Sequence, residues 1–164
     1  MSDAVHARVV TLLERELVAI EELHYRHHVC LLLLGIGDAT YLGVALDDLT
    51  AAEDELARID LLRAAAVAEL GARWDLDPTS VRLADLVGRA DETTRPPLEE
   101  LGERLRAATA ELTETRAMAM VLAAEHATEL GRRREQIEAG PAVTYDRAGR
   151  GRRDGGAALS DVVS

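Results

Sequence analysis

The segment from Asp3 to Leu34 contains no glycine and no proline, and this continuity constrains the fold more than any other feature of the chain. Apolar residues recur along it at steps of three and four, with Glu16 and His27 as polar interruptions. The stripe consists of Val5, Val9, Leu12, Leu13, Glu16, Ile20, Leu23 and His27. Because an α-helix has 3.6 residues per turn, this spacing predicts an amphipathic helix of about nine turns.

The sequence GIGD then ends this helix and starts the next. Either Gly35 or Gly37 can adopt the left-handed conformation that follows a last helical turn, and Asp38 suits the N-cap of the following helix. The second helix is predicted from Ala39 to about Arg73. Its stripe consists of Leu42, Leu46, Leu49, Leu56, Ile59, Leu62, Ala66 and Leu70.

Two proline-containing segments separate a short third helix from its neighbours. Pro78 in DLDPTS cannot lie inside a helix, so a short helix is predicted at about residues 80–90. The segment DETTRPP marks a new start, because prolines are tolerated in a first helical turn. The last helix is predicted from Leu98 to Ala139. Its heptad seam consists of Leu98, Leu101, Leu105, Ala108, Leu112, Thr115, Ala119 and Leu122.

The composition favours an all-α fold. The chain is rich in helix-forming residues, Phe is absent and Trp occurs once, whereas strands favour aromatic and β-branched residues. We expect an elongated antiparallel helical hairpin, a short helix and a long C-terminal helix, with coiled-coil-like packing. Residues 1–139 are predicted to form a single helical domain. Residues 140–164 are rich in Gly and Arg, and we predict a disordered tail there.

Three histidines and the one cysteine lie close together in HYRHHVC, residues 24–30. On a helix His24 and His28 share one face, and His27 and Cys30 share a neighbouring face. A zinc site needs three or four ligands that converge on one point, and these four spread over most of the helix circumference. We therefore predict no metal site and no cofactor, and we interpret Cys30 as a small buried residue.

Charge and motif content disfavour several classes of function. The formal net charge of −11 argues against binding to nucleic acid, which is itself a polyanion. The run VCLLLLGIG is about half the length of a membrane-spanning helix, and the N-terminus lacks the features of a signal peptide. We expect a cytoplasmic protein without membrane insertion. Since no phosphate-binding glycine loop and no GxSxG elbow occur, we expect no catalytic residues and no enzyme.

Apolar residues surround more of the last helix than one seam requires. Every residue from Ala117 to Ala124 is apolar, and such a helix is either enclosed on several sides or bound to a partner. Met118 and Met120 supply flexible, polarisable surface. We predict a partner-binding face formed by Leu101, Leu105, Leu112, Met118, Val121 and Leu122. Packing against the first two helices stays open as the other explanation.

Several short sequences occur in a recognisable order along the chain. They are LLERELVAIEEL in the first helix, the GD turn, ELG at residues 69–71, the proline-marked start of the last helix and TYDRAGR at residues 144–150. In this order and spacing the chain resembles the FlgN family of flagellar export chaperones. The resemblance covers about residues 5–149.

The resemblance implies a cytoplasmic chaperone for type III flagellar export. Such a chaperone binds the C-terminal helical segments of hook-filament junction proteins and prevents their premature assembly. It delivers them to the export gate, whose components are then further partners. One alternative interpretation is a structural coiled-coil protein that self-associates through the same heptads and has no export substrate. A second is a metal-binding helical enzyme or sensor that uses His24, His27 and His28. The sequence leaves open whether the chain is a monomer or a homodimer.

Overall fold

A computed structural model describes residues 4–37, 40–77, 79–138, 143–145 and 151–153. The chain divides into two compact units, Met1–Ala123 and Ala124–Ser164. The division falls within the last helix, whereas the sequence placed a domain boundary after residue 139.

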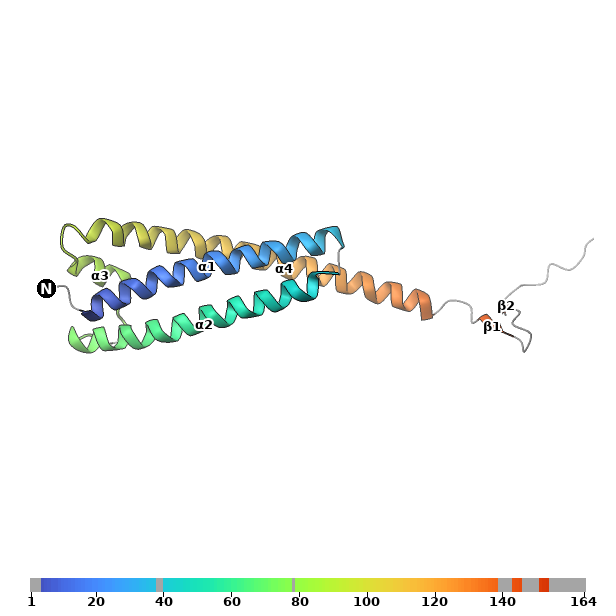
Figure 1. Ribbon diagram of the computed structural model, residues 1–164, viewed down its shortest axis with the longest axis horizontal. Coiled ribbons are helices and arrows are strands. Elements are labelled where there is room, and N and C mark those ends of the chain that lie inside the picture. The colour runs from blue at the N-terminus through green and yellow to red at the C-terminus, as the bar shows by residue number, and fades with distance from the viewer. Residues whose placement is uncertain (1–3, 38–39, 78, 139–142, 146–150, 154–164) are drawn as a thin grey trace, which may run out of the picture. The chain divides into compact units, whose positions relative to one another are not determined.

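The first unit is built from helices alone among its described residues, as the sequence predicted. Helix α1 spans Ala4–Ile36, α2 spans Leu42–Arg73, α3 spans Leu83–Arg89, and α4 begins in this unit and spans Arg95–Glu138. Helices α1 and α2 lie side by side and run in opposite directions. The part of α4 that belongs to this unit packs against α1 and runs in the same direction as α1 (Figure 1). The predicted hairpin, short helix and long last helix are all present.

A glycine makes the turn out of α1. Gly37 has φ of 68°, in the left-handed region that favours glycine, and its N–H donates to the carbonyl of Leu34 at 3.1 Å. The other candidate, Gly35, lies within α1 itself. The predicted N-cap, Asp38, lies outside the described residues, and α2 begins at Leu42, later than the predicted Ala39.

The predicted stripe of α1 is its core-facing side. One cluster of buried residues joins α1, α2 and α3, and a second joins α1 and α4, with partly buried residues of α2 packed against it. The first contains Val5, Val9, Leu12, Ala66, Leu70 and Leu86, and the second contains Ile20, Leu23 and Leu112. Glu16, which interrupts the stripe, pairs with Arg63 of α2 at 2.7 Å. The predicted stripe of α2 is partly wrong, because Leu46 and Leu62 are exposed.

Short polar segments start the last two helices. Asp85 accepts a hydrogen bond from the N–H of Arg82 at 2.8 Å, which caps the start of α3. Helix α3 therefore begins at Leu83, three residues after the predicted residue 80. Asp91 accepts from the hydroxyls and N–H groups of Thr93 and Thr94, and these bonds lower the pKa of its carboxyl to about 2. Helix α4 begins at Arg95, three residues before the predicted Leu98, so that Pro96 and Pro97 fall in its first turn.

A glycine within α4 lets α3 approach. A Cβ atom at Gly102 would lie 2.5 Å from Cδ2 of Leu83, so a larger residue there would displace the Leu83 side chain. Gly102 is buried, and Leu83 packs against the first core cluster. The contact fixes α3 against both the hairpin and α4.

In the second unit, two short strands lie within the predicted tail. Strand β1, Val143–Tyr145, pairs antiparallel with β2, Gly151–Arg153, so that Thr144 is opposite Arg152. The other residues of the predicted tail lie outside the described residues, as do residues 146–150 of TYDRAGR. Within the described part of the chain, no helix combines the length and the apolar character needed to cross a membrane.

The turn gives a test with an internal control. Gly37→Ala places a Cβ in the left-handed region and should lower the free energy of unfolding by ~1 kcal/mol. Gly35→Ala lies in helical backbone with open space around its Cβ, so it should be neutral or stabilising by up to ~1 kcal/mol. Urea denaturation of the three proteins measures both changes, and equal effects would contradict the assignment of the turn to Gly37.

Candidate partner-binding face

The first part of α4 faces the hairpin through its predicted seam. Leu98, Leu101 and Leu112 are buried, and Leu105 packs against the cluster of Ile20, Leu23 and Leu112. The seam therefore builds the core of the first unit up to this level.

Burial along α4 stops at Thr115. From residue 116 to residue 123 no side chain is buried, and Met118 and Val121 are 48% and 61% exposed. Met120 is exposed as well, and Leu122 is half-buried. This stretch is the one with apolar residues on every side, so it presents apolar surface to water.

The six predicted site residues thus separate into two groups. Leu101, Leu105 and Leu112 lie at or near the core, and Met118 and Val121 face solvent. Leu122 lies between the two groups in exposure. The sequence alone left core packing and partner binding open for all six, and the structure leaves Met118 and Val121 as the accessible ones. We define the α4 face as Met118, Met120 and Val121.

Polar contacts join α4 to the hairpin both along the seam and at its end. Arg104 pairs with Glu21 of α1 at 3.2 Å, and Arg116 pairs with Glu53 of α2 at 3.0 Å. The Oγ1 atom of Thr115 lies 3.0 Å from Nε2 of His24, which also lies 3.9 Å from Glu111 through Nδ1. Where the apolar seam ends, α4 is therefore held by hydrogen bonds and ion pairs.

His27 is the unusual member of the histidine segment. It is buried, and its Nε2 atom has no hydrogen-bond partner among the described residues. Burial lowers the pKa of the imidazole, the nearby Arg116 lowers it further, and Glu53 opposes both. His27 is thus held neutral inside the unit, close to the ion pair that joins α2 and α4.

The other members of the segment have separate roles. His28 stacks edge-on against His24, with ring centroids 4.7 Å apart. Cys30 is buried and donates its S–H to the carbonyl of Ala45 at 3.6 Å, and burial raises the pKa of its thiol. The thiol is therefore a structural group without the character of an activated nucleophile. Over the described residues, no three His, Cys, Asp or Glu side chains are placed to hold a metal ion.

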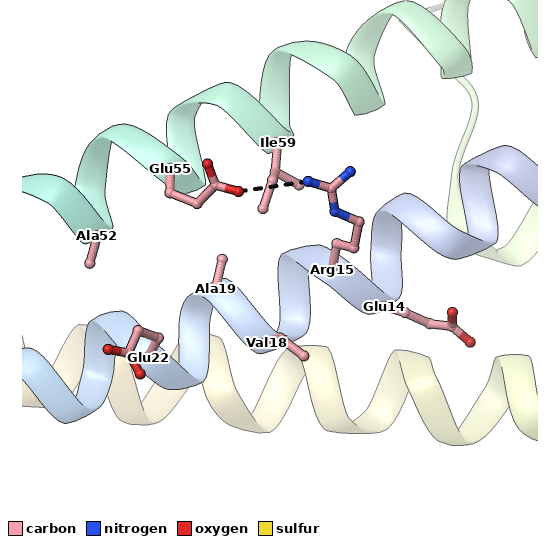
Figure 2. Close-up of a pocket in the computed structure, with 8 residues that line it drawn as sticks. All are labelled: Glu14, Arg15, Val18, Ala19, Glu22, Ala52, Glu55 and Ile59. Carbon is pink, nitrogen blue, oxygen red and sulfur yellow. Dashed lines mark ion pairs between the residues drawn. The ribbon is translucent and has the colours of Figure 1, made fainter.

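A second apolar surface lies on α1, and the sequence prediction missed it. Val18 is 63% exposed and lines a groove of about 370 Å³ between α1 and α2 (Figure 2). Tyr25 and Leu32 follow it at steps of seven residues and are also exposed. The seven-residue spacing of these three residues is the sequence signal that could have predicted this surface. The other apolar stripe of α1 explains the buried face of the helix, so the spacing did not lead to a prediction.

Comparison with known proteins adds no relative. The chain matches no family model, no curated protein and no solved structure.

The buried imidazole makes stability depend on pH in a defined direction. Because the pKa of His27 is lowered on folding from about 6.5, the unfolded chain takes up its proton at a higher pH than the folded chain does. The free energy of unfolding should therefore fall as pH drops through this range. His27→Leu removes the titration, so the variant should gain stability relative to the natural protein between about pH 7.5 and about pH 5.5. Urea denaturation at both pH values tests this, and a constant difference would contradict it.

Proposed function

We propose that this chain is a cytoplasmic chaperone of flagellar type III export, similar to the FlgN family. In this proposal it binds the C-terminal helical segments of hook-filament junction proteins, keeps them from assembling early and brings them to the export gate. The proposal treats the chain as a binding protein without catalytic residues.

The observation that carries the proposal is the change of environment along α4. Up to Thr115 the helix is packed on the hairpin, and beyond it Met118 and Val121 are exposed while the chain remains helical. A helix that presents methionine and valine to water suits the binding of an amphipathic helix by its apolar side. Unbranched methionine side chains can adapt to partners of different sequence.

The partner's chemistry follows from its role. Helical segments that later assemble into coiled coils expose apolar faces before assembly, and these faces are prone to aggregate. A complementary apolar helix face covers them without a cofactor. Release at the export gate requires moderate affinity, which a small apolar face with mobile side chains provides.

The α4 face is tested by the double substitution Met118→Glu with Val121→Glu. Both side chains already face water, so the variant should remain helical, as measured by circular dichroism. Binding should be lost, because pairing would bury carboxylates at a cost on the order of several kcal/mol, enough to abolish micromolar affinity. The measurement is recovery of a complex after co-expression with the hook-filament junction proteins of the same cell.

Two controls separate the possible reasons for loss. Leu61→Glu adds a charge at an exposed position of α2 and should leave the complex intact. Junction proteins without their C-terminal helical segments should not be recovered with the natural chain. Loss of helicity in the double variant would assign Met118 and Val121 to the core. A stable homo-oligomer that captures no junction protein would favour the self-associating coiled coil.

A further inference from the structure

The outer side of α1 is an apolar stripe that no described helix covers. It consists of Val18, Tyr25 and Leu32, which are all exposed. At seven-residue steps each lies only about 20° around the helix from the previous one, and the stripe is about 21 Å long at 1.5 Å per residue. Helices α2 and α4 contact other sides of α1, so the stripe is separate from both core clusters.

The groove between α1 and α2 extends the stripe sideways near its first residue. Its apolar part is formed by Val18 and Ala19 of α1 and by Ala52 and Ile59 of α2 (Figure 2). The two alanines have short side chains, which leave room for the side chains of another helix. Arg15 reaches across towards Glu55 at 3.7 Å and borders the groove at one end.

Acidic residues flank the stripe on both sides. Glu14 and Glu21 lie along one flank at heptad spacing and Glu22 lies on the other, and both Glu14 and Glu22 line the groove. Two arginines lie on the same flank as Glu22: Arg15, which also lines the groove, and Arg26, whose guanidinium lies 5.5 Å from the centre of the Tyr25 ring. Glu21 and Glu22 each pair with an arginine, whereas Glu14 has no partner among the described residues. Across residues 1–123 there are 23 acidic residues and 12 arginines, so this unit carries the whole formal charge of −11. A helix packed on the stripe would therefore lie in a negative potential.

We propose that the α1 stripe and its groove bind an amphipathic helix of a partner protein whose apolar residues are flanked by arginine or lysine. The partner helix packs along α1 with its apolar residues against Val18, Tyr25 and Leu32. Its basic residues lie opposite Glu14, Glu21 and Glu22, as flanking charges do in paired helices. This surface goes beyond the proposed α4 face and does not depend on it.

The same charges argue against a second copy of this chain on the stripe. Two α1 stripes packed on each other would place glutamate flanks close to glutamate flanks, and like charges at such positions are unfavourable. The first units would also repel each other through their net charge. A basic partner removes both penalties.

The experiment uses the full chain and two synthetic helix-forming peptides of about 21 residues. Both carry Leu and Ala at heptad a and d positions, and they differ only in having Arg or Glu at the flanking positions. Fluorescence anisotropy measures binding, and NMR shifts of the labelled chain locate it. The Arg peptide should bind with shifts at Val18, Ala52 and Ile59, and the Glu peptide should bind at least about tenfold more weakly at low salt.

Substitutions assign the binding to the stripe. Val18→Glu changes an exposed side chain, so the fold should persist by circular dichroism while Arg-peptide binding falls by about tenfold or more. Glu14→Arg should weaken the Arg peptide and strengthen the Glu peptide. Leu61→Glu and the Met118→Glu, Val121→Glu variant are matched controls and should both bind the Arg peptide normally.

Three outcomes would overturn the inference. They are equal binding of the two peptides, binding that Val18→Glu leaves unchanged, and a dimer in sedimentation that Val18→Glu dissociates while the Arg peptide fails to bind. Because the α4 variant keeps the stripe intact, loss of junction-protein binding in that variant leaves this result unaffected, and failure here leaves the α4 face untouched.

Discussion

Small side chains at the contact between α1 and α2 determine how the first unit is held together. Among the described helices, α1 and α2 are the pair whose backbones approach each other closely over a long stretch. Ala19, Cys30, Ala45 and Ala66 are buried in this unit, and the thiol of Cys30 reaches the backbone of α2 at Ala45. With no Phe in the chain, the core gains apolar contact through close packing of helices and not through large rings.

Helix α4 is attached in a different way. It reaches the hairpin through long leucines such as Leu101 and Leu112 and, beyond them, through Thr115 and Arg116. Exposed ion pairs contribute little to stability. Few strong contacts therefore hold α4 to the hairpin near Thr115 and Arg116. Opening of α4 from the hairpin should therefore cost less than separation of α1 from α2. A helix attached in this way can adjust its position when a partner covers its exposed side.

Helix boundaries could be predicted where glycine and proline stop the chain. The first helix was placed within about two residues at each end, and the two prolines located the start of α4. Heptad spacing also identified Leu98, Leu101 and Leu112 as seam residues. Heptad spacing could not predict which residue of another helix each seam residue contacts. Thr115, a polar residue at a seam position, lies opposite His24, a contact between residues 91 positions apart in the chain.

The candidate site was harder to predict, because exposure depends on what the neighbouring helices cover. Met118 and Leu112 look alike as apolar residues of one helix, yet the first is exposed and the second buried. On α1, one apolar stripe is enough to explain the amphipathic pattern, so the sequence does not mark Val18 and Leu32 as a second apolar surface. The strands at residues 143–145 and 151–153 lie in a segment whose glycine and arginine content had suggested no regular structure.

The packing of α3 places a natural spectroscopic probe at the base of the bundle. Trp74, the one tryptophan of the chain, caps α2, and the guanidinium of Arg89 from α3 lies 4.4 Å from the centre of its ring. Leu83 of the same helix α3 lies against Gly102 of α4, so α3 connects the surroundings of the indole to α4. We therefore expect the intrinsic fluorescence of Trp74 to change when α4 leaves the hairpin and α3 moves with it, and the chain has no second tryptophan to obscure that change.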